Sequence, residues 1–403
     1  MTSRRVPPFF LLCSGFVVCG MVTVLPGPLL PVMAARWGLH DVQSGAFFAA
    51  EFLASTVGSI FSPHWLRRNL PLGYASMTAG VLLLIAAGRA AGSSGHTLAL
   101  AAFALVGLGI GLSVTATNLT VGITAEEQGG PGARARRISI VNLGWGLGAV
   151  VCPWLIAGAE QRGQLDALLL AIALATAGMF AGLVPQCREP EFGSRTAGRR
   201  SVRAEAGVLI FFAAFLFLYV GVETVVGGWI TTYTHRFSGM TLAQAGLMVS
   251  LYWMSLLAGR WLGSLALRSW SERAVWLPSL GLALAAVIAL VVPHGPAGVM
   301  LAVALAGAGL GPVFPIGISR MLGQLRDHRN TGWVFAMTAS GGAVLPWLTG
   351  LVSTRTGSLR IGFAVPVAGL AAILVLAAAE KGLLGREADS DLHRSMSGPG
   401  APS

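Results

Sequence analysis

Long apolar runs, separated by short polar segments, dominate the pattern of this 403-residue chain. Most runs approach or exceed the roughly 20 residues that an α-helix needs to cross a bilayer. They lack the alternation of apolar and polar residues that is typical of lipid-facing barrel strands. The pattern predicts an all-α membrane protein with twelve transmembrane helices, at residues 9–33, 42–63, 71–91, 97–123, 138–159, 165–184, 207–233, 243–266, 274–292, 297–319, 330–353 and 361–379.

The composition supports a membrane location. Hydrophobic residues make up 54% of the chain and charged residues only 11%, whereas soluble domains carry roughly 25% charged residues. No soluble core needs twelve apolar segments of this length. We therefore expect a multi-pass protein of the cell (inner) membrane, with the lipid bilayer as its surroundings and the monomer as its working form.

The basic residues predict the orientation. If the N-terminus is cytoplasmic, 21 of the 27 lysines and arginines fall on cytoplasmic loops and ends, and 6 fall outside. This is a strong positive-inside bias, so we expect both termini in the cytoplasm. The net charge of +11 thus reflects topology and does not indicate a nucleic-acid partner. The first apolar run is too long for the core of a signal peptide and is interpreted as the first span.

An internal repeat divides the spans into six and six, on either side of the longest internal polar segment. Three local matches recur in the same order, although glycine-rich spans can also match by chance. The matches are Gln43–Gly45 with Gln244–Gly246, Gly107–Gly111 with Gly307–Gly311, and Gly148–Leu155 with Gly342–Leu348. Parallel six-helix repeats of this kind resemble the arrangement of major facilitator transporters. The expected domains are an N-terminal six-helix bundle (1–185), a cytoplasmic linker (186–206), a C-terminal six-helix bundle (207–384) and a disordered cytoplasmic tail (385–403).

Glu223 is the principal candidate for chemistry, because it lies near the middle of an apolar span. A carboxylate at this depth costs about 2.5–3.5 kcal/mol on insertion scales and normally faces a partner or a water-filled path. Tyr219 lies one turn earlier on the same helix face. Gly227 and Gly228 follow and can unwind the helix there. We expect Glu223 to bind substrate or carry a coupled ion; the alternative is a neutral carboxyl bonded to a neighbouring helix.

Other polar groups at membrane depth form a second tier of candidates. Glu51 in span 2 has the same two interpretations as Glu223. Asn118 in span 4 and Asn142 in span 5 could contact a hydroxylated substrate or link helices by hydrogen bonds. Several aromatic residues lie near these groups and could stack on a sugar ring, although aromatics more often serve packing. They are Trp145, Trp229, Tyr252 and Trp253.

Arg260 and Arg320 lie near the cytoplasmic ends of spans 8 and 10, and we assign them structure and gating. The sequence contains no phosphate-binding loop, no zinc-ligand spacing and no nucleophile–base set, which argues against an enzyme. We therefore expect no metal, no cofactor and no ATP-driven transport. The four cysteines are interpreted as packing residues.

Several motifs resemble a known family. The overall plan resembles the major facilitator superfamily. The stretch Tyr219-Val-Gly-Val-Glu223 with Gly228-Trp229 resembles the span 7 signature of the fucose–galactose–proton symporter family and its sodium-dependent glucose transporter-like branch. Gly311–Pro315, Gly341–Gly350 and Thr115–Asn118 are similar to the same family's spans 10, 11 and 4. The resemblance implies a sugar carrier.

Two departures limit what the resemblance implies. The fucose permeases of this family carry working carboxylates in span 1 and at the start of the span 4 motif. This chain has no acid in span 1, and Val114 occupies the span 4 position. The superfamily's loop 2–3 motif lacks its aspartate within Gly58–Arg68. The coupling carboxylates of those permeases therefore cannot be transferred to this chain.

The sequence thus predicts a secondary active transporter that works by alternating access between two bundles. We expect its substrate to be a small polar solute, first of all a hexose-type sugar, taken up together with H+ or Na+. Two alternatives remain open. One is proton-coupled efflux of an amphipathic compound, which the scarcity of polar side chains in the spans favours. The other is a transport-inactive sensor or scaffold on the same fold.

Overall fold

The computed structural model describes residues 7–129, 131–187, 206–292, 295–324 and 331–396, and the secondary structure within these ranges is helical. The helices of the first part are α1 (Phe9–Thr23), α2 (Pro26–Trp37), α3 (Asp41–Phe61), η1 (Ser62–Trp65), α4 (Leu66–Arg89), α5 (Gly92–Gly129), α6 (Pro131–Gln161), α7 (Leu165–Leu183) and η2 (Val184–Cys187). Those of the second part are α8 (Ala206–Phe237), α9 (Leu242–Ala266), α10 (Glu272–Val291), α11 (Pro296–Leu310), α12 (Val313–Gln324), α13 (Thr331–Thr356), α14 (Leu359–Gly362) and α15 (Ala364–Met396).

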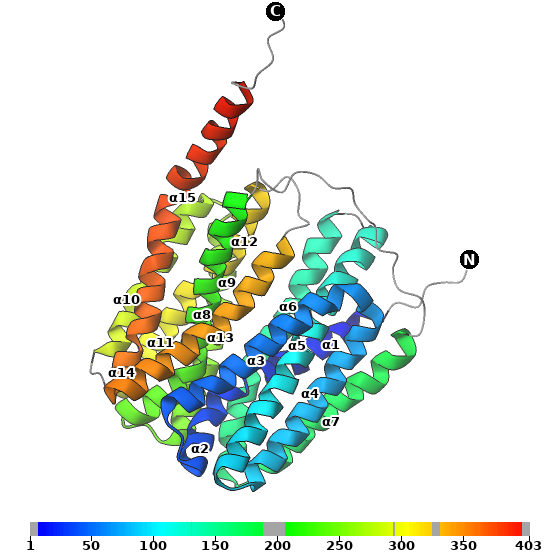
Figure 1. The fold of residues 1–403 in the computed structure, drawn as a ribbon, viewed down its shortest axis with the longest axis vertical. Helices are drawn as coiled ribbons and strands as arrows, with labels where there is room; N and C mark the ends of the chain where they lie inside the picture. Colours follow the sequence, from blue (N-terminus) through cyan, green and yellow to red (C-terminus); the bar gives the residue numbers. More distant parts are fainter. Residues whose placement is uncertain (1–6, 130, 188–205, 293–294, 325–330, 397–403) are drawn as a thin grey trace, which may run out of the picture.

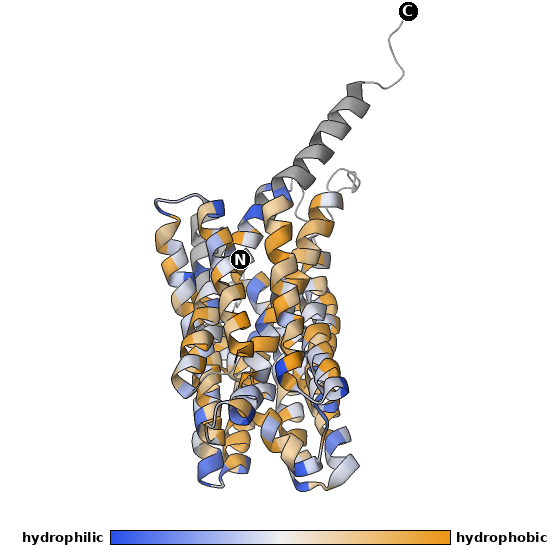
Figure 2. Cartoon of the chain, turned by 90° about the vertical axis from the view of Figure 1, so that its left-hand side faces the viewer, coloured by the Kyte–Doolittle hydropathy of each residue, from blue (hydrophilic) through white to orange (hydrophobic). Residues whose placement is uncertain are grey.

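These helices account for the twelve predicted spans. Among the described residues, ten stretches are long and apolar enough to cross a membrane. One of them, Asp41–Arg89, contains both α3 and α4, and α13 provides a further span outside the ten. Figure 2 shows hydrophobic residues along the middle of the helices and most hydrophilic ones towards their ends.

Prolines interrupt two of the predicted spans. The first span is split into α1 and α2 at Pro26, and the tenth into α11 and α12 at Pro312. Proline has no N–H group for the helix ladder and clashes with the preceding turn. In lipid, the backbone groups freed in this way must find partners inside the protein. At the second break the carbonyl oxygen of Leu310 accepts a hydrogen bond from Tyr219 of α8.

The repeat is visible in how close-packed glycines are used. In the first part, a Cβ on Gly107 of α5 would lie 1.8 Å from the carbonyl oxygen of Glu51 in α3. In the second part, a Cβ on Gly307 of α11 would lie 2.5 Å from the carbonyl oxygen of Tyr252 in α9. Equivalent glycines thus bring equivalent helices into backbone contact, as small residues do between membrane helices.

The helices form two sets. Helices α1–α7 pack mainly against one another, as do α8–α15, and the sets meet through three principal pairs: α3 with α13, α6 with α9, and α2 with α8. In Figure 1 the sets come together near the end where α2 lies and stand farther apart at the end from which α15 extends. We call the end where α1 and α8 begin the terminal face, and the other end the opposite face.

Three expectations about local structure need comment. Helix α8 continues unbroken through Gly227 and Gly228, so the unwinding that these glycines could permit does not occur in this structure. Phe48 of α3 packs where a Cβ on Gly228 would lie. Helix α15 continues to Met396, where we expected a disordered tail from residue 385; the residues up to Met396 contain no proline and many good helix formers. The central part of the predicted linker, 188–205, lies outside the described residues.

Candidate functional site

Glu223 lies at the centre of the second set of helices, held by groups from three elements. Its Oε1 accepts a hydrogen bond of 2.9 Å from the Tyr219 hydroxyl, one turn away on α8. Arg260 of α9 places its Nη2 atom 3.5 Å from the same oxygen. The side chain of Glu223 is 13% exposed and that of Arg260 is 28% exposed. The carboxylate thus has a counter-charge at hand and remains partly accessible.

The position of Arg260 differs from the expectation. We assigned Arg260 to structure and gating near the end of its span, but it is the ionic partner of the mid-span Glu223. Arg260 lies 19 residues after the loop residue Thr241, whereas Glu223 lies 14 residues before Phe237, so the Arg260 side chain reaches back towards the middle of the span to contact Glu223. A charged pair at this depth is less costly than either charge alone. Arg260 therefore belongs to the candidate site.

The break in span 10 contributes to the same centre. The Tyr219 hydroxyl also lies 3.1 Å from the carbonyl oxygen of Leu310, the last residue of α11. The Tyr252 hydroxyl of α9 bonds the carbonyl oxygen of Glu223 at 3.3 Å. These contacts tie α8, α9 and α11 together around one carboxylate. They fix the direction of the Glu223 side chain, as a preorganised binding site requires.

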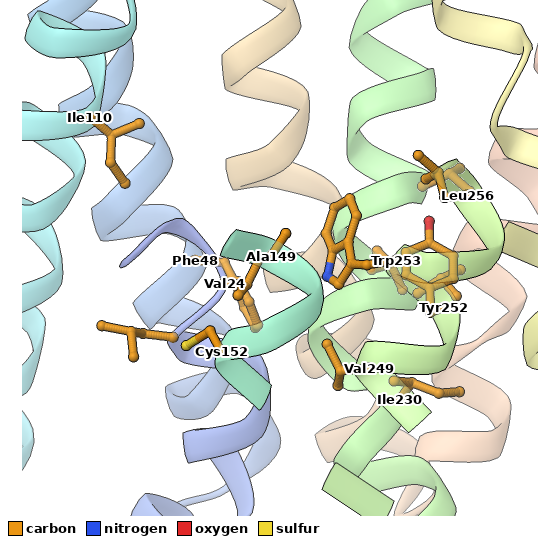
Figure 3. Packing of buried hydrophobic residues seen from close by; sticks show 14 of the residues in the cluster. Val24, Phe48, Ile110, Ala149, Cys152, Ile230, Val249, Tyr252, Trp253 and Leu256 are labelled. Carbon is orange, nitrogen blue, oxygen red and sulfur yellow. The ribbon is translucent and has the colours of Figure 1, made fainter. Parts of the chain in front are cut away.

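Tryptophans from both sets meet beside this centre. Trp145 of α6 and Trp253 of α9 lie edge to face, with ring centroids 5.3 Å apart. Figure 3 shows Trp253 directed from α9 towards the segment of α6 that carries Ala149, with Tyr252 beside it. The Trp253 Nε1 and the Arg260 Nε are both buried and lack a hydrogen-bond partner among the described residues. Two N–H donors are thus left unsatisfied at the junction of the two sets.

Trp229 lies closer to the opposite face and serves the contact between the sets. It is fully buried, and its Nε1 donates to the carbonyl oxygen of Pro346 in α13 at 3.1 Å. Its ring packs against Phe48 of α3 at 6.3 Å. Every hydrogen-bonding group of its indole is therefore already used within the protein. Packing is sufficient to explain Trp229.

Asn118 and Asn142 bond each other. The Asn142 side-chain amide donates to Oδ1 of Asn118 at 3.1 Å and to the carbonyl oxygen of Ile138 at 2.8 Å. Asn118 in turn donates to the carbonyl oxygen of Val114 at 3.0 Å. The pair links α5 to α6, which agrees with the helix-linking interpretation, while Asn142 stays exposed. Its role in substrate binding stays a prediction.

Glu51 occupies a different environment from Glu223. Glu51 as a whole residue is 1% exposed, and neither of its carboxylate oxygens has a hydrogen-bond partner among the described residues. It lies within the first set of helices, near enough to Cys19 of α1 for an electrostatic interaction. The structure therefore does not bring the two candidate carboxylates into one site.

Arg320 lies at the terminal face within the second set. It bonds Glu380 of α15 at 3.0 Å and 2.5 Å, and Glu272 of α10 at 3.3 Å. These contacts join α10, α12 and α15 and do not bridge the two sets. The arrangement explains a structural role for Arg320, and the gating role stays a prediction.

An ionic group that the sequence analysis missed joins the two sets at the opposite face. Asp41, at the start of α3, accepts two hydrogen bonds of 2.7 Å from Arg236 at the end of α8. Ser353 of α13 donates a third bond of 2.5 Å to Asp41. We call Asp41, Arg236 and Ser353 the clasp. Its residues lie far apart in the sequence at span ends, where charges are ordinary, so pattern alone gives no signal.

The contacts between the sets show which face reaches Glu223. Close approaches run from Asp41–Gly350 at the opposite face to Phe52–Gly342 and Gly146–Leu257 near the level of Glu223. Beyond that level the two sets stand farther apart towards the terminal face (Figure 1). This arrangement favours access to Glu223 and Arg260 from the terminal face. A central site open to one side only is the geometry of an alternating-access carrier.

These features are those of a membrane protein built from two packed sets of helices, with a candidate site near mid-span. The sequence matches the Major Facilitator Superfamily over residues 11–329, and the chain belongs to that family. It is a multi-pass secondary transporter and not an enzyme, as predicted.

Similar proteins include sugar carriers. The chain is 26% identical to a glucose/galactose transporter of Brucella abortus, over 87% of this chain and 89% of that protein. Its fold is similar to the transporter FucP in the outward conformation, with a TM-score of 0.60 and 18% identity over 93% and 98% of the two chains. It is also similar to a D-xylose-proton symporter, with a TM-score of 0.74 and 12% identity over 91% and 96%. The predicted fold is confirmed.

Proposed function

We propose that this protein takes up a hexose-type sugar together with H+ or Na+, and that the sugar binds at Glu223, Arg260 and Trp253. The observation that carries the proposal is the pair of buried N–H donors, on Trp253 and Arg260, that have no acceptor within the described part of the chain and lie near the Glu223 carboxylate. A sugar hydroxyl can accept a hydrogen bond from an N–H group and donate its own hydrogen bond to a carboxylate, so it satisfies both kinds of group at once.

The surrounding groups fit a sugar in two further ways. Glu223 offers acceptor oxygens that are only partly used by Tyr219 and Arg260. Trp145 and Trp253 supply aromatic surface from opposite sides of the junction, which suits the apolar C–H faces of a pyranose ring. The relationship to a glucose/galactose transporter, although distant, supports the same substrate class.

The test is transport and binding with purified protein in lipid vesicles. Uptake of glucose, galactose, fucose and xylose is measured under an imposed proton gradient, a sodium gradient or neither, with export of an amphipathic dye as a separate arm. We expect uptake of at least one hexose driven by one of the two gradients. Dye export without sugar uptake or sugar binding would establish the efflux alternative instead.

A matched pair of variants tests the site. Trp253→Phe keeps an aromatic ring and removes the N–H donor, so one hydrogen bond of about 0.5–1.5 kcal/mol is lost, or roughly a 2- to 13-fold weakening of sugar binding. Trp270→Phe makes the same change at a residue that is 63% exposed near the terminal face, and sugar binding should stay unchanged. Equal affinities of both variants would refute the assignment of Trp253.

A further inference from the structure

Glu51 is a buried carboxyl group that the proposed sugar site does not use. Helix α3 presents two different faces at this depth. Gly45, Phe48 and Phe52 lie on one face and contact α13 or α8 of the second set. Glu51 lies beside this stripe, and its backbone abuts Gly107 of α5 within the first set. The carboxyl group is therefore separated from the Glu223 site by the aromatic residues on the interface face of α3.

The two carboxyl groups differ in how charge is compensated. Glu223 has the Arg260 guanidinium at 3.5 Å and the Tyr219 hydroxyl at 2.9 Å. Glu51 has neither a cation nor a hydrogen-bond donor among the described residues. An ionised carboxylate without such partners is very costly at membrane depth, and a bound proton removes the cost.

The groups around Glu51 leave few other ways to neutralise it. Helix α1 presents Cys19, whose Sγ lies 3.9 Å from the Ser113 hydroxyl of α5. The hydroxyls beside Cys19 donate to backbone carbonyls of their own helices, Thr23 to Cys19 at 2.8 Å and Ser113 to Ile110 at 3.3 Å. Helix α5 presents Gly107, and α13 meets the neighbouring Phe52 through Gly342. Within the described part of the chain, Cys19 is the titratable group that reaches Glu51 from these helices.

We propose that Glu51 carries the coupled proton, in the first set of helices, while the second set binds the sugar at Glu223 and Arg260. This inference rests on the proposed function. The carboxylate takes up one proton from one side of the membrane and, after the sets rearrange, releases that proton to the other side. Helix α3 connects the two events, because it holds Glu51 and also forms the contact with α13 that must open at the opposite face.

The deciding variant is Glu51→Gln, which keeps the shape of a protonated carboxyl and cannot release a proton. Proton-driven accumulation of sugar should be lost, while exchange of labelled for unlabelled sugar across vesicles of equal pH should be retained. Glu223→Gln should instead weaken sugar binding. Glu160→Gln, at the end of α6 near the opposite face, is the control and should retain both activities.

A second measurement needs no sugar. The melting temperature of the ligand-free protein is followed from acidic to alkaline pH. In the wild type, raising the pH places an uncompensated charge on Glu51 and lowers the melting temperature; in Glu51→Gln this alkaline decline should be smaller. Glu51→Asp, which still titrates, should retain the decline.

The outcomes separate the two proposals. Retained proton-driven accumulation in Glu51→Gln, uptake driven by sodium alone, or an alkaline decline equal to that of the wild type would overturn the role of Glu51. If the wild type binds none of the sugars, the proposed function fails. The melting curves would still decide whether Glu51 titrates as proposed.

Discussion

The clasp at the opposite face allows a quantitative prediction about the balance between conformations. Asp41 receives three short hydrogen bonds, two from Arg236 and one from Ser353. All three cross between α3 in the first set and α8 or α13 in the second. Opening the opposite face must break them, so they stabilise the present conformation selectively.

The size of the effect follows from the exposure of the partners. Breaking a buried pair costs about 3–5 kcal/mol, whereas an exposed pair contributes at most about 1 kcal/mol. The Asp41 side chain is 9% exposed and that of Arg236 is 38% exposed. For Asp41→Asn, which keeps part of the hydrogen bonding, we therefore expect about 1–2 kcal/mol. That corresponds to roughly a 5- to 30-fold shift in the ratio of the two conformations.

Distance measurements between two spin labels, made by electron paramagnetic resonance, can detect this shift in the ratio of conformations. Spin labels at Gln164→Cys, in the loop before α7, and at Gln244→Cys, in the first turn of α9, lie on exposed positions of the two sets at the opposite face and report its opening in a cysteine-free background. Asp41→Asn should increase the population with the long distance. Asp166→Asn is the control, because Asp166 pairs with Arg89 within the first set and is half exposed. Distance distributions that are identical for Asp41→Asn and the wild type would refute the reasoning.

Two further predictions concern stability in detergent, measured by thermal unfolding. Gly107→Ala should destabilise the protein by about 1–3 kcal/mol, because the added methyl group overpacks against the Glu51 backbone. The control is Gly88→Ala, whose added methyl group meets no atom within 4 Å and should be neutral or stabilise the protein by up to about 1 kcal/mol. Equal melting temperatures of the two variants would contradict this reasoning. Arg320→Gln should cost about 3–5 kcal/mol, because it leaves the 2% exposed Glu380 without its counter-charge. Adding Glu380→Gln should restore part of the loss, and no recovery in the double variant would argue against the pairing.

The sequence was sufficient for the fold because the strongest signals are local. Twelve apolar runs and the spacing of glycines identify the spans and the repeat, and Gly107 and Gly307 make the equivalent contacts that the repeat predicts. The contact of Tyr219 with Glu223 also follows from helix periodicity, since four residues make about one turn.

Other parts of the site depend on how helices are placed against one another. The pairing of Glu223 with Arg260 requires the relative depth of α8 and α9, and the clasp requires three span ends to meet. Hydropathy fixes depth only to within a turn or two, which exceeds the reach of a hydrogen bond. For the same reason the sequence could not show that Glu51 lies inside the first set and Glu223 inside the second.

The Glu223–Arg260 pair has a consequence for the energy source of transport. Moving one elementary charge through the membrane potential changes the free energy by about 2.3 kcal/mol per 100 mV. A carboxylate and a guanidinium 3.5 Å apart carry no net charge together, so the voltage exerts almost no net force on this pair when the site changes the face to which it opens. A neutral sugar bound at this pair adds no net charge to it. The electrical work of each cycle must then be done on the coupling ion. The charge moved across the membrane per transported sugar would therefore equal the charge of the coupling ions that accompany it.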